Sequence, residues 1–151
     1  MLDATDSAIL RRWQAEPDLQ VTELALEMGL SQSVLSRRID RMRENGVLKG
    51  VQGVIDWSAL GYGVEVSLRF TLDKGEPRAL DLFVAAAREV PEVTEIQTFL
   101  GRVDVRLAVI ARDLAHWRQL YGERILTLPH ISEIEALLHV AQVKTDAVLP
   151  L

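Results

Sequence analysis

The sequence has no cysteine, few aromatic side chains and no long apolar run, and each absence excludes a class of protein. Without cysteine, the 151 residues form no disulfide, thiolate metal site, iron–sulfur cluster or cysteine nucleophile. No window approaches the roughly 18 consecutive apolar residues that a membrane-spanning helix needs, so we expect no membrane partner. The acidic residues 1–6 lack the basic and apolar pattern of a signal peptide, so we expect a cytoplasmic protein.

An excess of positive charge is also missing. The formal net charge is -5, so the field of the whole protein does not attract nucleic acid, and any such binding requires a local basic patch. The 48% apolar and 26% charged side chains are typical of a folded chain. A chain of this length buries about 70% of the surface that it exposes when unfolded, which is enough for one domain or two small ones.

The first fifty residues carry the periodicity of three short helices. The pattern predicts a helix over residues 3–16, a two-turn helix that ends at Gly29, and a third that begins after Ser31 and closes at Asn45 and Gly46. The residues that we expect to face inward are Ile9, Leu10, Trp13, Leu24, Ala25, Met28, Leu35, Ile39 and Met42. Because the last two helices are joined by a tight turn, they are a candidate helix-turn-helix.

The second half alternates strands and helices. We expect strands at residues 64–72, 93–100, 105–110 and 131–143, with a tight hairpin turn at 101–104. The helix after Pro77 should face inward with Leu80, Phe83, Val84 and Ala87, and the helix capped by Asp113 with Leu114, Trp117, Leu120 and Tyr121. Their order, strand-helix-strand-strand-helix-strand, is the ferredoxin-like βαββαβ arrangement.

The predicted fold class is therefore α+β, with two domains. A helix-turn-helix (winged-helix-like) DNA-binding domain covers residues 1–50, and an extended connector covers 51–63. A ferredoxin-like domain for effector binding and oligomerisation covers residues 64–151. Such a sheet leaves one face open, and we expect apolar residues on that face, which predicts a partner subunit.

The third predicted helix carries a local basic patch. Residues 37–49 hold five positive side chains against two negative ones, Asp40 and Glu44. The residues at the start of a recognition helix reach base edges, so the predicted readers of bases are Gln32, Ser33, Ser36 and Arg37. The predicted phosphate contacts are Arg38, Arg41 and Lys49. The alternative is a solvated helix face on which Arg38 or Arg41 pairs with Asp40 or Glu44.

Nothing in the sequence argues for catalysis, a metal or a cofactor. His116, His130 and His139 are spaced unlike any metal-ligand pair within one element, and no HExxH cluster occurs. The serines lack a GxSxG context, and no glycine-rich phosphate loop is present. We therefore predict a binding protein and not an enzyme.

The turn at residues 101–104 is a candidate effector site. Its backbone N–H groups are free, Arg102 can pair with a carboxylate, and Asp104 can accept from an ammonium group. These are the two charged ends of a free amino acid. The alternative is that Asp104 only caps the turn and Arg102 is solvated. Trp117 and Tyr121 could line an apolar cleft, but their helical spacing favours core packing.

Short stretches along nearly the whole chain resemble the Lrp/AsnC (leucine-responsive regulatory protein) family of transcription regulators. They are residues 2–10, 23–25, 29–31, 38–39, 46–50 and 91–93, Gly101 with Asp104, and residues 128–129 and 143–144. The resemblance implies a DNA-binding helix-turn-helix followed by an effector-sensing ferredoxin-like domain. It also implies homodimers that form through the sheets, commonly assemble into octamers, and bind an amino acid between dimers beside Gly101.

The chain departs from the family pattern near this implied pocket. His130 stands where relatives usually have glycine, and Ile134 and Ala136 stand where two threonines are common. These departures predict a less polar pocket wall and an effector other than the usual one.

Three functions follow from these observations. The leading prediction is a sequence-specific regulator that binds double-stranded DNA and is modulated by an amino acid or similar small molecule. The first alternative is an architectural, chromatin-like DNA-binding protein without effector. The second is an enzyme that resembles sirohaem decarboxylases, although residues 98–110 lack the Arg/His-rich, Trp-containing run typical of those enzymes.

Overall fold

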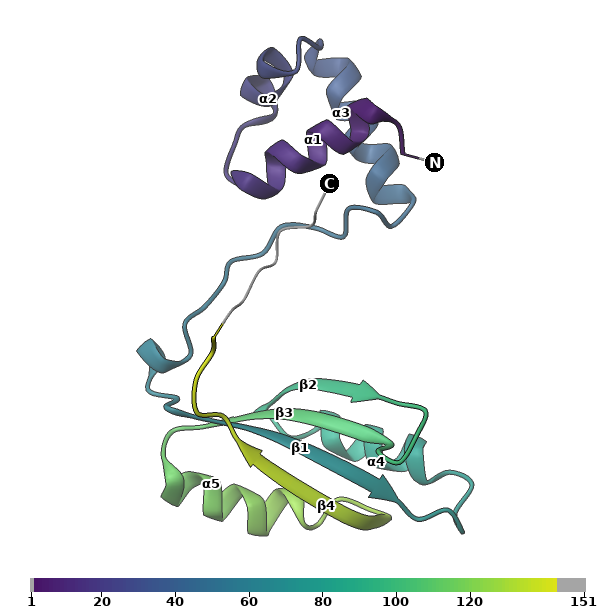
Figure 1. Ribbon diagram of the computed structural model, residues 1–151, viewed down its shortest axis with the longest axis vertical. Coiled ribbons are helices and arrows are strands. Elements are labelled where there is room, and N and C mark those ends of the chain that lie inside the picture. The colour runs from purple at the N-terminus through teal and green to yellow at the C-terminus, as the bar shows by residue number, and fades with distance from the viewer. Residues whose placement is uncertain (1, 144–151) are drawn as a thin grey trace. The chain divides into compact units, whose positions relative to one another are not determined.

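The computed structural model describes residues 2–143, which divide after Val54 into two compact units. Figure 1 labels the helices and strands of both units. Within residues 2–143, every helix is too short or too polar to cross a membrane.

The N-terminal unit contains the three predicted helices. They are α1 (Ala4–Ala15), α2 (Val21–Glu27) and α3 (Gln32–Glu44). Their shared core consists of Ile9, Leu24, Ala25, Leu35, Ile39 and Met42, all of which the periodicity predicted to face inward. The helical spacing of these residues gives each short helix one apolar side, and burial of that side stabilises the unit.

The turn between α2 and α3 is fixed by backbone hydrogen bonds. Gly29 takes φ +64°, a conformation that glycine adopts readily. The Leu30 N–H donates to the Ala25 carbonyl at 2.9 Å, and the Gly29 N–H donates to the Leu26 carbonyl at 3.1 Å. The chain then enters α3 at Ser31, whose hydroxyl accepts from the Val34 N–H.

The connector has no strand. Residues 48–56 contain neither helix nor strand, as expected for an extended segment. The later part of the predicted connector contains a short 3-10 helix, η1 (Ser58–Leu60). Asp56 caps it by accepting from the Ser58 N–H at 2.9 Å.

The C-terminal unit has the predicted ferredoxin-like topology. Its elements are β1 (Val64–Leu72), α4 (Ala79–Arg88), β2 (Val93–Thr98), β3 (Val105–Ala111), α5 (Leu114–Leu120), the π-helical segment η2 (Tyr121–Ile125) and β4 (Ile131–Leu138). The strands pair antiparallel in the order β2-β3-β1-β4. Residues of α4 and α5 share one core with the sheet, so both helices cover the same face (Figure 1).

Two strand ends differ from the prediction. β2 ends at Thr98 and β4 ends at Leu138, both earlier than their apolar patterns suggested. The connection between β2 and β3 spans residues 99–104, longer than a tight turn. The reason is that the Asp104 N–H donates to the Phe70 carbonyl of β1 at 2.8 Å, which ties this end of the loop to the neighbouring strand.

The inward side of α4 is also shifted from the prediction. α4 begins at Ala79, two residues after Pro77, and its buried residues are Ala79, Phe83 and Ala87. Leu80, expected inside, is 42% exposed. Small alanines line this side because the Phe83 ring fills the space against Phe70, with ring centroids 4.7 Å apart.

The open face of the sheet is polar, and the expectation of an apolar face was wrong. The strand register places these residues on it: Glu65, Ser67, Arg69, Thr71, Glu95, Gln97, Arg106, Ala108, Ile110, Glu133, Glu135 and Leu137. Arg106 donates to Ser67 and to Gln97, each at 2.8 Å. The alternation that buries one side of β1 necessarily turns its polar residues to this face.

A pair of substitutions in α4 tests its orientation. Phe83→Ala should lower the free energy of unfolding by about 3–5 kcal/mol, because Phe83 is fully buried in the core. Leu80→Ala, in the same helix, should lower it by much less, because Leu80 is 42% exposed. Chemical denaturation followed by circular dichroism measures both, and similar losses would contradict the orientation.

Candidate nucleic-acid interface and effector site

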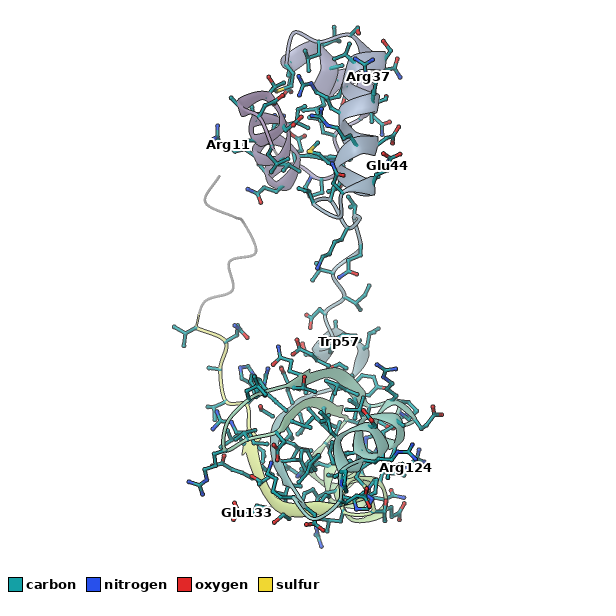
Figure 2. The ribbon with its side chains drawn as sticks, turned by 90° about the vertical axis from the view of Figure 1, so that its right-hand side faces the viewer. Arg11, Arg37, Glu44, Trp57, Arg124 and Glu133 are labelled. Atoms are coloured by element: carbon teal, nitrogen blue, oxygen red, sulfur yellow. The ribbon has the colours of Figure 1, made fainter. Side chains whose placement is uncertain are left out.

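One side of α3 is exposed and polar. Leu35, Ile39 and Met42 are buried against α1 and α2. The predicted DNA-binding residues Gln32, Ser33, Arg37 and Arg41 are exposed, Ser36 and Arg38 are half-buried, and Lys49 is exposed beyond the helix end. Figure 2 labels Arg37 on the first half of α3 and Glu44 at its end. The exposed start of α3 has the residue types that contact base edges.

Two of the predicted phosphate-binding arginines are held by carboxylates of α1 and its cap. Arg38 donates to Asp3 and to Asp6, each at 2.7 Å, and Arg41 donates to the second oxygen of Asp6 at 2.7 Å. The Asp6 side chain is 1% exposed. These contacts join the start of α1 to the middle of α3.

The Asp6 carboxylate remains ionised in this environment. Burial raises the pKa of Asp6, but the hydrogen bonds from Arg38 and the Asp3 N–H, with the charge of Arg41, lower it further than burial raises it. The net pKa of Asp6 lies below its ordinary value. The hydrogen bond from Arg38 is also the main cause of the lowered pKa of Asp3.

The remaining cations of the basic patch differ in their pairing. Arg43 lies 3.4 Å from Asp40 at the surface. The side chains of Arg37 and Lys49 make no ion pair or hydrogen bond with the residues described here. The alternative in which Arg38 or Arg41 pairs with Asp40 or Glu44 was therefore wrong, because both arginines bind Asp6 of α1 and the arginine near Asp40 is Arg43.

A second candidate site lies beside the β2–β3 loop. An open hollow of about 430 Å³ is lined by Arg69, Thr71, Arg102, Val103, Glu133, Ile134 and Glu135. Arg102 lies 3.9 Å from Glu133, and Arg69 lies 3.4 Å from Glu135. Figure 2 shows Glu133 projecting outward from β4. The hollow thus offers both a cation and an anion to a small ligand.

Asp104 does not line this hollow, although its neighbours Arg102 and Val103 do. Its carboxylate accepts from the Leu72 N–H at 2.8 Å and from the Lys74 ammonium group. The Leu72 N–H and Lys74 together lower the pKa of Asp104 more than burial raises it. Both donors lie outside the turn at residues 101–104, so Asp104 joins this loop to the end of β1 and to Lys74.

Of the other predicted effector residues, Ile134 lines the hollow, whereas Gly101 and Ala136 do not. Gly101 takes φ +154°, a conformation that residues with a side chain rarely adopt. Ile134 is half-buried against the core, and Ala136 is exposed on the helix-covered side of β4. The wall of the hollow is more polar than Ile134 and Ala136 predicted, because Glu133 and Glu135, which alternate with them along β4, line it.

The histidines lie in separate environments. His116 accepts from the Arg112 N–H at 3.1 Å, and His139 lies 3.5 Å from Glu65. His130 takes φ +62°. This left-handed conformation is one that glycine adopts readily and residues with a side chain rarely adopt. Among residues 2–143, no three His, Cys, Asp or Glu side chains are grouped so that they could hold a metal ion.

Sequence reasoning missed several residues of both sites. Asp3 and Asp6 were not predicted as site residues, although their spacing places both at the same end of α1. Lys74 could not be paired with Asp104 from local pattern, because they are separated by 30 residues. The sequence held one signal for Glu133, because it is a polar residue of β4 that alternates with inward-facing residues.

Two sequence comparisons cover most of the chain. Residues 65–149 match the Lrp/AsnC ligand-binding domain, and residues 2–49 match a winged helix-turn-helix DNA-binding domain. A proline dehydrogenase transcriptional activator from Rhodobacter capsulatus is 36% identical over 132 residues, covering 87% of this chain and 86% of that protein. A leucine-responsive regulatory protein from Haemophilus influenzae is 28% identical over 143 residues, covering 95% and 86%.

Solved structures have the same fold. An AsnC family transcriptional regulator from Agrobacterium tumefaciens is 30% identical with a TM-score of 0.85, covering 99% of this chain and 97% of that one. A transcriptional regulator from Neisseria meningitidis, solved in complex with L-Met, has a TM-score of 0.89 at 23% identity, with the same coverage.

The role of Asp104 predicts a pH dependence. Its pKa in the folded protein lies below the ordinary 3.8, so its ionised contacts contribute fully above that pH and are lost as the pH falls through the folded-state value. Asp104→Asn should therefore lower the melting temperature at neutral pH, and its difference from the wild type should narrow below pH 3.8. Glu133→Gln, at an exposed carboxylate, is the control; a difference for Asp104→Asn that is constant with pH would contradict this role.

Proposed function

The chain belongs to the Lrp/AsnC family of transcription regulators, and we propose that it reads specific DNA sequences with the exposed side of α3. The family assignment carries with it a DNA-binding helix-turn-helix and a ligand-binding domain. A single observation supports the proposal for α3. The Arg37 side chain is exposed near the start of the helix and makes no ion pair within the described residues.

The residues proposed to contact bases lie in the first two turns of α3. Arg37 can form two hydrogen bonds to guanine, Gln32 can form two to adenine, and Ser33 and Ser36 can bond either bases or phosphates. A recognition helix presents its N-terminal residues to the floor of the major groove, which suits all four positions.

Phosphate contacts position the helix without reading sequence. We assign this role to Lys49, which is exposed and makes no side-chain ion pair with the described residues. We assign Arg38 and Arg41, the other two members of the predicted phosphate set, to the support of α3, because both already bind Asp6.

Dimers supply two recognition helices for two half-sites about one helical turn apart. We propose that the open sheet face is the dimer contact. Its side chains carry both signs of charge, with Arg69 and Arg106 among several glutamates, so a second copy related by a two-fold axis can pair opposite charges. Assembly of dimers into a higher oligomer, such as an octamer, is part of the same proposal.

We propose that an amino acid or a similar zwitterion binds in the hollow beside the β2–β3 loop. Arg102 is available for the carboxylate, and Glu133 lies near it for the ammonium group. Asp104, the acceptor that the sequence suggested, already binds Leu72 and Lys74. A bound effector changes DNA binding only as far as it binds one assembly better than another.

Alanine substitution of Arg37 tests base reading. Arg37→Ala should weaken binding to a duplex selected from a random library by about 1–3 kcal/mol, and weaken binding to unselected duplex much less. A gel-shift titration measures both affinities. Arg118→Ala, which removes one exposed cation from α5, is the control and should leave both unchanged. Equal losses on the two duplexes with Arg37→Ala would exclude base reading.

A thermal-shift screen tests the effector proposal. An L-amino acid that binds the native protein should stabilise it by about 2.7 kcal/mol at 100 times its Kd and so raise the melting temperature. Arg102→Ala should abolish the shift because it removes the partner of the carboxylate, whereas Arg118→Ala should retain it. The proposal fails if no L-amino acid raises the melting temperature, or if Arg102→Ala responds like the wild type.

A further inference from the structure

Asp6 is the one polar or charged residue among residues 2–143 that is fully buried. It belongs to α1, yet each of its two carboxylate oxygens binds an arginine of α3, the helix proposed to enter the major groove. Arg38 is further bound to Asp3 and its side chain is 25% exposed, whereas the Arg41 side chain is 52% exposed.

These arginines have two possible acceptors, the buried Asp6 and a DNA phosphate. An ion pair with a buried carboxylate is little screened by salt, whereas one with a phosphate at the surface is screened strongly. Transfer of an arginine to a phosphate would also leave the Asp6 charge buried with one partner fewer, which is unfavourable. The balance favours retention of both arginines by Asp6.

This retention changes the charge that α3 presents. Sequence alone counts five cations between residues 37 and 49. Arg38 and Arg41 pair with Asp3 and Asp6, and Arg43 pairs with Asp40. The cations without such a partner among the described residues are Arg37 and Lys49.

We infer that Asp6 is a specificity-determining positioning residue: it withholds Arg38 and Arg41 from the DNA backbone and so keeps sequence-independent binding weak. The inference rests on the proposed DNA-binding function of α3. Phosphate contacts supply most non-specific affinity, so fewer of them raise the ratio of specific to non-specific binding.

The substitution Asp6→Asn keeps the shape of the side chain and removes its charge. Each arginine released to a phosphate should steepen the slope of log K against log salt by about 0.9, so we expect a change of about 0.9 to 1.8 with unselected duplex. Affinity for that duplex should rise, and the ratio of selected to unselected binding should fall. A merely structural role of Asp6 would lower the melting temperature and leave the salt slope unchanged.

Two further variants identify the cause. Glu16→Gln makes the same change in net charge at an exposed carboxylate of the same unit, and Arg12 there keeps its second partner, Glu27. This control should retain the wild-type slope. The double variant Asp6→Asn/Arg41→Gln should have a slope that is shallower by about 0.9 than the slope of Asp6→Asn. The inference is overturned if Glu16→Gln steepens the slope as much as Asp6→Asn does, or if Asp6→Asn leaves the slope at its wild-type value.

A separate comparison applies if circular dichroism shows that Asp6→Asn is unfolded. Lys49→Gln should make the slope shallower by about 0.9, as loss of one phosphate contact requires, and Arg41→Gln should make it shallower by much less. Equal effects of the two variants overturn the inference while leaving the proposed function intact. A wild-type protein that binds neither duplex overturns both.

Discussion

The contact between Asp6 and the two arginines of α3 determines what the N-terminal unit can present to DNA. The apolar core of this unit is small, and its side chains constrain the direction of the helices less tightly than hydrogen bonds of fixed geometry do. Asp6 joins the first turn of α1 to residues more than thirty positions later. The exposed side of α3 therefore depends on a carboxylate that is itself only 1% exposed.

The C-terminal unit uses the same device. Asp104 ends the β2–β3 loop and holds it against β1 through the Leu72 N–H. In both units an aspartate joins separate elements, while an arginine to which we assign a ligand contact stays exposed: Arg37 in one unit and Arg102 in the other. On the functions proposed for these arginines, support of the fold and ligand contact are divided between different residues.

Local periodicity was sufficient to predict the elements and their order, because one apolar side per helix and alternate burial in β1 determine which faces pack together. It could not give the partners of Asp6 or Asp104, because both contacts join residues at least thirty positions apart. The error on the open sheet face had another cause. The alternation of β1 already placed Ser67 and Arg69 there, but the prediction relied on general expectations for such sheets.

The acidic balance of the chain gives the few cations of α3 their importance. With a net charge of -5, the long-range field does not draw the protein to DNA, and at physiological salt charges act over only about 8 Å. Binding then depends on contacts made after docking, and each half-site contributes few of them. A dimer that needs both half-sites at once discriminates more sharply when each contact is weak, because neither helix alone then holds the protein on unrelated sequence. Because Arg38 and Arg41 are paired with Asp6, they do not strengthen the contact at either half-site, and each contact stays weak.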